Sequence, residues 1–492
     1  MNSGNEEDVL VVGGGLAGMT AAYELQRRGC DTTIVEATDR LGGKAGASMV
    51  DGNVEEHGYH IFPEWYENVW RIVDELGIRD NFEGVSDFHQ LRDGDHPNYR
   101  TFRNLTSARY LFHNLRAGVM SPTDMFLFFY ASLDLMSQPY RRRDALDQIT
   151  INGFLKSRFY GKESVAKRFQ DLILKGISVP TYDVSAMTMR NMMRYWARNP
   201  LPMHSILRTD LQSGLIDPFE ERLRELGCDI EKETPVVELV PGEEGIESVV
   251  VETEDDGRVE RSAESVVLAV PVEKAVDLVD DDLHEAAPEL SNLKYLDSRP
   301  MAALHVHFDR KLPEIPRDHV NLLGSEYGLS YVDVSQWWND EDDDGTVLNL
   351  IASDYETLRG LDDETATSEL LDDLRPYLPD FDDDEVRTTY LQPHDDEPLF
   401  MNEVGIWKYR PGPTTSLSNL YLAGDYCRSH ADLVSMEGAV TTGLHAANAV
   451  RADRRLDRPV NVRKPDTYPR ELLVLGRLLL APLALVARLV SD

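Results

Sequence analysis

The chain has 492 residues, too many for one compact core, so two or three domains are expected. It carries 87 Asp and Glu against 50 Lys and Arg, and the formal net charge of -37 excludes nucleic acid as a partner. We interpret this acidic surface as a halophile-like adaptation that keeps the protein hydrated in high salt. Three scattered cysteines predict neither a disulfide framework nor a thiolate metal site, and no metal is expected.

The first predicted element is a nucleotide-binding βαβ unit. A short apolar strand at 9–12 runs into Gly-x-Gly-x-x-Gly at 13–18, directly before a helix-forming segment at 19–28. Gly13 permits the tight turn, Gly15 lets the backbone approach a pyrophosphate, and Gly18 lets the helix pack close against the strand. The phosphates are expected at the positive N-terminus of that helix.

A second strand is predicted at 31–35, and Glu36 stands at its end, 18 residues after Gly18. A carboxylate there accepts hydrogen bonds from ribose hydroxyls. The chain continues as E-x-x-x-R-x-G-G through Arg40, Gly42 and Gly43. This stretch resembles the FAD-dependent amine-oxidase and carotenoid-desaturase superfamily, which implies FAD, with the second glycine pair against its flavin side. The expected cofactor contacts in this unit are Gly13, Gly15, Leu16, Ala17, Gly18, Glu36, Ala37, Arg40, Gly42, Gly43 and Lys44.

The next pattern lies at 58–66, where Gly-Tyr-His-Ile-Phe is followed by a tyrosine six residues after the histidine. It resembles the plant-type phytoene desaturases, and the resemblance implies that His60, Ile61 and Tyr66 contact the FAD. His60 and Tyr66 are therefore candidates for a catalytic base by proximity alone, and no side chain identifies itself as that base. The alternative for His60 is a hydrogen-bonded core histidine.

Residues 91–202 change to helices rich in Met, Phe, Tyr and Arg. The apolar run at 125–136, followed by three arginines at 141–143, fits either a lipid surface or ordinary protein core. The segment from Thr150 to Met187 resembles the helical substrate domain of carotenoid desaturases.

The chain then returns to the cofactor domain. Asp217 and Pro218 open an amphipathic helix, and 235–239 enters a strand in which the superfamily resemblance implies that Val236 contacts the adenine edge. A hairpin around Asp256 follows, and then a buried strand at 266–270. Plant-type desaturases tend to carry an arginine four residues before the proline-opened helix. This chain has Gly214 there, which leaves the substrate identity open.

Residues 292–393 alternate strand and helix patterns and predict the sheet of a substrate domain. The acidic run at 340–344 lacks the spaced ligand order of a calcium loop, so we interpret it as a solvated turn.

A second diagnostic stretch runs from Leu420 to Ala439, where a strand, a Gly-Asp turn and a new helix are predicted. The resemblance implies that Asp425 binds the ribityl and pyrophosphate region, that the helix start at Met436 faces the flavin, and that Ala439 faces the substrate. A helix N-terminus there stabilises negative charge on reduced flavin. An amine oxidase is expected to place aromatic rings beside the flavin, whereas Leu433 and Val434 stand before Met436.

The tail inverts the charge of the chain, since residues 451–492 hold nine Lys and Arg against five Asp and Glu. Residues 472–490 are almost wholly apolar, and on a helix Arg470, Arg477 and Arg488 fall on one stripe. We expect that stripe to face water or lipid headgroups while the helix lies in the membrane interface. The alternative is a helix docked on the protein or on a second copy.

The predicted fold class is α/β, with a discontinuous FAD-binding Rossmann-type domain (1–90, 208–290 and 395–455). A second α+β substrate domain of a helical insert plus a sheet is predicted at 91–207 and 291–394, followed by the basic tail at 456–492.

The resemblance implies an FAD-dependent oxidoreductase that desaturates an apolar polyisoprenoid by hydride transfer. The alternatives are a flavin amine oxidase, an isoprenoid dehydroxylase or isomerase, and a non-catalytic flavin scaffold. A quinone is the favoured electron acceptor. Because no secretory signal is recognised, we expect a cytoplasmic, peripherally membrane-associated protein.

Overall fold

The computed structural model describes residues 7–103, 108–118, 120–139, 143–177, 179–253, 257–338, 345–378, 383–393, 398–456 and 458–490. Several sequence predictions lie outside these ranges. They concern the amino terminus up to residue 6, Arg141 and Arg142 of the arginine cluster, Asp256 of the predicted hairpin turn, and the acidic run at 340–344.

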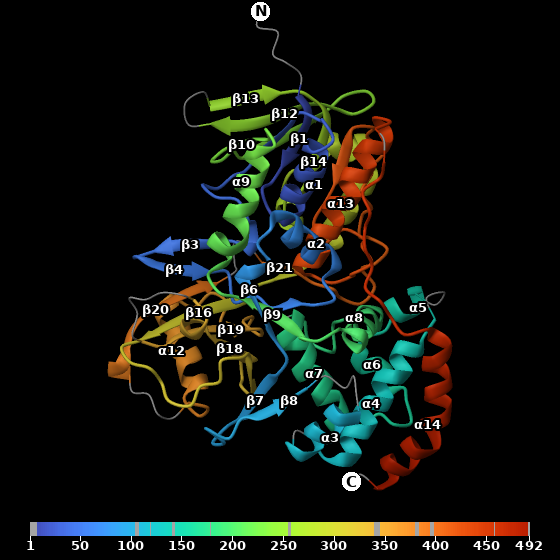
Figure 1. Ribbon diagram of the computed structural model, residues 1–492. Coiled ribbons are helices and arrows are strands. Elements are labelled where there is room, and N and C mark those ends of the chain that lie inside the picture. The colour runs from blue at the N-terminus through green and yellow to red at the C-terminus, as the bar shows by residue number, and fades with distance from the viewer. Residues whose placement is uncertain are drawn as a thin grey trace, which may run out of the picture.

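A five-stranded parallel sheet forms the core of the upper part of the molecule in Figure 1. Its order is β10 (Asp229–Glu231), β2 (Thr32–Val35), β1 (Glu7–Val12), β14 (Ala263–Leu268) and β22 (Leu420–Leu422). The side chains of β1 alternate between two cores. Val9 and Val11 pack with helix α1 (Leu16–Gln26), and Leu10 and Val12 pack on the opposite face. Both faces are covered, which explains why these strands are continuous apolar runs.

Two helices lie side by side on the first face, α1 and α13 (Met436–Asp453). A Cβ at Gly443 of α13 would lie 2.3 Å from the Ala17 carbonyl oxygen, so this glycine permits the close approach. The opposite face is covered by the sheet β11 (Val236–Pro241), β12 (Ile246–Thr253) and β13 (Gly257–Arg261). Helix α9 (Asp217–Glu225) begins at the predicted Asp217, directly after a π-helical turn at Gln212–Ile216. The predicted α/β fold class is confirmed, while the domain boundaries remain a prediction.

A seven-stranded sheet occupies the lower left of Figure 1, with α12 (Asp363–Leu374) beside it. The described pairs are antiparallel except for β17 against β7. The order is β20 (Val386–Pro393), β16 (Ala302–Phe308), β19 (Val347–Ala352), β18 (Leu329–Asp333), β17 (Val320–Leu323), β7 (Phe88–Arg92) and β8 (Arg100–Phe102). Two strands that follow the first βαβ unit therefore complete a sheet built mainly from residues after 300.

Helices fill the lower right of Figure 1. They are α3 (Ala108–Arg116), α4 (Pro122–Ser137), α5 (Arg143–Asp147), α6 (Ile151–Lys156), α7 (Glu163–Ile177) and α8 (Ala186–Arg198). Helix α4 begins at a Ser121 cap, whose hydroxyl accepts the Asp124 N–H, with Pro122 in the first turn. Most of its apolar side chains are buried. Of the two interpretations of 125–136, protein core is therefore right and lipid surface is wrong.

The last helix, α14 (Arg470–Val490), packs along α4 at the outer edge of this cluster. Its orientation corrects the prediction that the basic stripe faces outward. Arg477 Nη1 lies 2.9 Å from the carboxylate of Asp134, and Arg470 Nε donates to the Ser137 carbonyl at 3.1 Å. Asp134 is buried on α4 and needs a cation, which draws the basic face of α14 inward.

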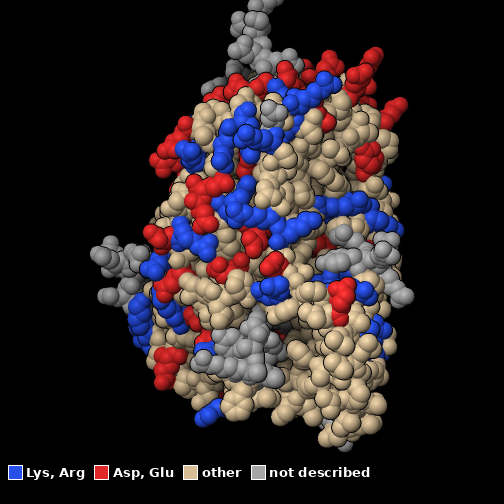
Figure 2. Space-filling model, turned by 45° about the vertical axis from the view of Figure 1, so that its right-hand side comes forward, with Lys and Arg blue, Asp and Glu red and all other residues tan. Residues whose placement is uncertain are grey.

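The outer face of α14 is consequently apolar and exposed. Its exposed side chains are Leu472, Leu475, Leu478, Leu479, Leu483, Leu485, Val486, Leu489 and Val490. By length and composition this helix is long and apolar enough to cross a membrane. Figure 2 shows that the lower right of the surface is largely free of charge, whereas charged residues crowd the upper part. Contiguous apolar surface of this extent marks an interaction face.

Candidate functional site

The glycine motif forms a tight backbone turn between β1 and α1. Gly13 has φ of +102°, a left-handed conformation that favours glycine. A Cβ at Gly18 would lie 2.0 Å from the Gly13 carbonyl oxygen, so the helix packs against the turn only with glycine there. A Cβ at Gly15 would meet no atom within 4 Å. Gly15 therefore borders open space at the N-terminus of α1, where a pyrophosphate would lie.

Glu36 lies at the end of β2, as predicted, and its carboxylate holds the glycine turn. Its Oε2 accepts the Gly14 N–H at 2.7 Å, and its Oε1 accepts the N–H and the hydroxyl of Thr38, both at 2.9 Å. The side chain is nearly buried, while the neighbouring Ala37 is exposed. A carboxylate has about four acceptor positions, so ribose hydroxyls remain compatible with these contacts.

The second glycine pair, Gly42 and Gly43, lies against the glycine turn at 13–15. The Gly42 N–H donates to the Gly14 carbonyl at 2.9 Å, and both Gly42 and Gly43 have positive φ. Arg40 holds this loop through a 3.1 Å hydrogen bond from its Nε to the Ser48 hydroxyl. Lys44 Nζ lies 3.0 Å from a Glu273 carboxylate oxygen. Residues 13–15 and 42–44 therefore form one continuous backbone surface.

The N-terminus of α13 approaches the same region from the other side of the chain. Ser435 caps this helix by accepting the Gly438 N–H at 3.1 Å, so Met436 occupies the first helical position. A Cβ at Gly438 would lie 2.6 Å from the Leu433 carbonyl oxygen. Asp425 is half-buried close by, and desolvation raises the pKa of its carboxyl while the nearby Lys44 lowers it. The structure thus brings together Asp425, Lys44 and a helix N-terminus.

Sequence reasoning missed the residue that organises the loop between Asp425 and α13. Arg410 is buried, and its guanidinium donates to the carbonyls of Asp425, Tyr426 and Cys427 at 2.7–2.8 Å. Its Nη1 also lies 2.6 Å from Asp432 Oδ1. Arg410 therefore fixes the backbone that presents Asp425. It belongs to no recognisable sequence motif, and its partners lie 15 to 22 residues away.

A second missed contact anchors α13 to α2 (Glu67–Leu76). The buried Glu437 carboxylate accepts the backbone N–H groups of Asn68 and Val69 at 3.0–3.2 Å, so a side chain of one helix caps the N-terminus of another. The Asn68 amide adds a 2.7 Å hydrogen bond to the same carboxylate. Burial nevertheless dominates and raises the pKa of Glu437 to about 8.

The remaining predicted residues fall in different places. Burial lowers the pKa of His60 to about 4, and its Nδ1 lies 2.7 Å from the Gly58 carbonyl oxygen. The imidazole is therefore neutral, with the Nδ1 proton donated to Gly58 and Nε2 left as an acceptor. Burial raises the pKa of Tyr66, whose phenol stays protonated. Val236 opens β11 beside residues 233–234, whose N–H groups pair with the Thr38 and Glu36 carbonyls.

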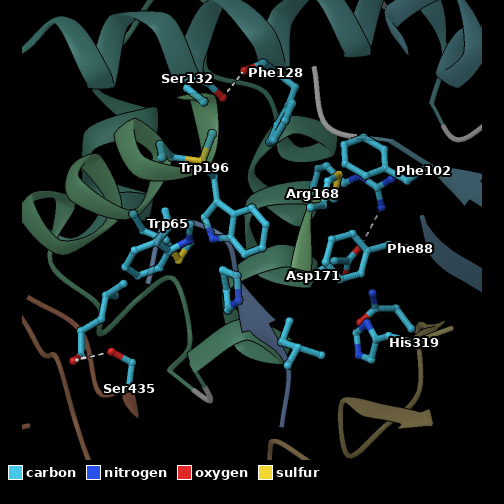
Figure 3. Close-up of a pocket in the computed structure, with 18 of the residues that line it drawn as sticks. Trp65, Phe88, Phe102, Phe128, Ser132, Arg168, Asp171, Trp196, His319 and Ser435 are labelled. Carbon is cyan, nitrogen blue, oxygen red and sulfur yellow. Dashed lines mark hydrogen bonds and ion pairs between the residues drawn. The ribbon is translucent and has the colours of Figure 1, made fainter. Parts of the chain in front are cut away.

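A mainly apolar cavity of about 240 Å³ begins at this site and extends between the helices and the seven-stranded sheet. Ile61 and Tyr66 line it together with Leu433, Val434 and Ser435, whereas His60 and Ala439 are not in its lining. The predicted role of Ala439 therefore finds no support in the cavity. Figure 3 shows Ser435 at one side of the cavity, Arg168 at the other, and the rings of Trp65, Trp196 and Phe88 between them. Such a space suits a flat apolar ligand.

Comparison with known proteins identifies the family to which this architecture belongs. The family of flavin containing amine oxidoreductases matches residues 16–451, and the chain belongs to this family. It is 25% identical over 469 residues to the 15-cis-phytoene desaturase of Synechococcus elongatus, covering 90% of this chain and 96% of the relative. It is 26% identical over 487 residues to the zeta-carotene desaturase of a Synechocystis species, covering 91% and 97%.

Among solved structures, wild-type putrescine oxidase bound to putrescine superimposes with a TM-score of 0.69 at 17% identity. The match covers 91% of this chain and 99% of that structure, and at this identity it concerns the fold alone. The chain is an FAD-dependent oxidoreductase. Its residues fit the cofactor. The second glycine pair and the N-termini of α1 and α13 border one continuous surface, and the space beside Gly15 is open along it.

Proposed function

We propose that the chain dehydrogenates a long apolar polyisoprenoid, phytoene-like or carotenoid-like, at the expected FAD site. The apolar cavity that begins at Leu433, Val434 and Ser435 carries this proposal. Its lining is dominated by aromatic and methionine side chains, which bury a flat hydrocarbon without specific hydrogen bonds. The carotenoid desaturases among the relatives support the same substrate class.

Bound FAD supplies the hydride acceptor for such a reaction. The chain contributes orientation and electrostatics. The N-terminus of α13, held by the Ser435 cap, favours negative charge beside it. The aromatic walls exclude water and hold a polyene against the candidate cofactor surface. His60 and Tyr66 are the predicted candidates for the proton acceptor. Tyr66 reaches the cavity but its phenol stays protonated, whereas His60 keeps Nε2 as an acceptor outside the cavity lining.

The amine-oxidase alternative is less well supported by the charges of the site. A protonated amine requires an anionic partner when it leaves water. In the described lining of the cavity the one carboxylate is Asp171, and its Oδ2 lies 3.9 Å from the guanidinium of Arg168. A cation entering this cavity would therefore meet a balanced ion pair.

We propose further that the enzyme attaches peripherally to a membrane through the outer face of α14. Nine exposed Leu and Val side chains support burial in the lipid interface. Helix α4 separates α14 from the cavity, and Phe129 and Met136 of α4 contact both. A lipid-soluble substrate and a quinone acceptor would then share one compartment with the enzyme.

Product analysis tests the proposed reaction. The purified, FAD-loaded protein is incubated with phytoene in vesicles and a soluble quinone, and the products are resolved by mass spectrometry. We expect products lighter by two hydrogens per turnover. Isomers of unchanged mass would instead assign the isomerase activity. Loss of water from a hydroxylated isoprenoid, offered in a parallel incubation, would assign the dehydroxylase activity.

A further inference from the structure

The cavity has a polar end that dehydrogenation of a pure hydrocarbon does not require. On the side away from Ser435, its lining changes from aromatic rings to Gln90, Arg168, Asp171 and Asn321. Figure 3 shows Arg168 and Asp171 on that side, beside the rings of Phe102 and Phe88. Arg168 and Gln90 are each only 8% exposed, so these groups are buried rather than at a solvated mouth.

Strand pairing places two of these residues together. Asn321 of β17 is the register partner of Gln90 of β7 in a parallel pair, so the two side chains are neighbours on one face of the sheet. Two positions earlier stand Phe88, at the start of β7, and His319, directly before β17, and both line the cavity. The sheet thus presents rings and then amides along one wall, and α7 adds Arg168 and Asp171 from across the cavity.

The hydrogen bonds at this end are incomplete. Arg168 Nη2 donates to Gln90 Oε1 at 2.8 Å, and Arg168 Nη1 lies 3.9 Å from Asp171 Oδ2. Asn321 Oδ1 is buried and accepts no hydrogen bond from the described residues. A buried polar atom without a partner costs free energy, which a ligand donor in the cavity would recover.

The pattern of donors and acceptors defines the missing group. Arg168 offers N–H donors, and Asn321 Oδ1 needs a donor. A hydroxyl satisfies both, because its oxygen accepts and its hydrogen donates. A carboxylate fits less well, since Asp171 already balances the charge of Arg168 and a second anion would be left without a counterion.

We propose that the natural substrate is an isoprenoid bearing a hydroxyl group at the end remote from the cofactor, bound by Arg168, Gln90 and Asn321. The long apolar part of this ligand rests on the proposed function, whereas the hydroxyl site rests on the polar end alone. A site built to bond a hydroxyl discriminates strongly against the analogue that lacks it.

The test compares two ligands of one C40 polyisoprenoid skeleton, the hydrocarbon and its terminal alcohol. Affinity for the FAD-loaded full-length protein is measured by quenching of tryptophan fluorescence, since Trp65 and Trp196 line the cavity. This readout needs no turnover, so it is independent of whether the proposed dehydrogenation occurs. We expect the alcohol to bind at least tenfold more tightly. Arg168→Met should reduce that ratio about tenfold.

Two further variants keep the test decisive. Asn321→Leu leaves the contacts of Arg168 intact and should also lower the ratio of affinities. Ser132→Ala is the control, because the Ser132 hydroxyl lines the cavity but already donates to the Phe128 carbonyl at 2.8 Å. Its ratio should stay within twofold of the wild type. Equal affinities of the wild type for both ligands, or an unchanged ratio in Arg168→Met and Asn321→Leu, would overturn the inference.

Discussion

Arg410 Nη1 and Asp432 Oδ1 lie 2.6 Å apart, and both side chains are about 1% exposed. This buried ion pair sits under the loop that presents Asp425. Removing one partner of such a pair typically costs about 3–5 kcal/mol, because the other charge remains buried and unpaired.

We therefore expect Arg410→Met to lower the free energy of unfolding by about that amount and to weaken FAD binding. Urea unfolding followed by circular dichroism measures the first effect, and flavin absorbance after desalting measures the second. Arg428→Met is the matched control, since Arg428 is exposed on the same loop. Equal stability of the two variants would contradict the role assigned to Arg410.

Substitutions at two glycines of the nucleotide turn should have different effects, one on FAD binding and the other on folding. Gly15→Leu places a side chain in open space beside α1, so the protein should fold normally and lose FAD. Gly18→Val drives a Cβ into the Gly13 carbonyl and should destabilise the fold itself. Thermal unfolding and bound flavin are measured for both variants. Full flavin occupancy in Gly15→Leu would contradict the placement of the pyrophosphate at this turn.

Glu56 should contribute a loss of stability as pH rises from about 5 to 8. Burial raises the pKa of Glu56 to about 8 from its ordinary 4.5. Below the ordinary value both the folded and unfolded states are protonated. Above it the unfolded chain ionises first, so folded stability is lost at up to about 1.4 kcal/mol per pH unit until the folded pKa is passed.

Glu56→Gln should remove this contribution. The amide oxygen keeps an acceptor for the Leu211 N–H, which Glu56 binds at 2.7 Å. Unfolding free energies at pH 5 and pH 8 are compared with those of Glu221→Gln, an exposed control. A pH dependence that is identical in both variants would show that Glu56 is ionised in the fold.

Membrane attachment should depend on the outer face of α14 and not on its arginines. The double substitution Leu478→Glu and Leu479→Glu alters two side chains that are 61% and 68% exposed, so folding should be unaffected. Flotation with neutral phosphatidylcholine vesicles in high salt should be lost, because apolar burial is not screened by salt. Leu361→Glu, an exposed leucine elsewhere, is the control. If the double variant still floated with the vesicles, another surface of the protein would carry the membrane attachment.

Point substitutions are preferable to deleting the whole tail. Leu473 of α14 packs against Leu133 and Met136, and Arg477 contacts the buried Asp134. Deletion would expose this apolar surface and leave the carboxylate without one of its cations. A change in solubility of the truncated protein would then report damage to the helical cluster as well as loss of the lipid contact.

The features that could be predicted from the sequence are those set by residues close together in the chain. The glycine turn, Glu36 at the strand end and the start of α13 follow from short motifs whose backbone geometry is set by neighbouring residues. Prediction failed where geometry depends on distant partners. The periodicity of α14 identifies two faces, but only Asp134, more than 300 residues earlier, determines which face turns inward. Arg410 and Glu437 were missed because their partners lie on separate elements.

The proposed function requires that the flavin is reduced by an isoprenoid and not by an amine. The direct measurement is anaerobic mixing of the FAD-loaded protein with detergent-dispersed isoprenoids, both hydrocarbon and terminal alcohol, and separately with primary and secondary amines, while flavin absorbance is followed. We expect bleaching by at least one isoprenoid and none by the amines. Rapid bleaching by amines with no response to any isoprenoid would contradict it.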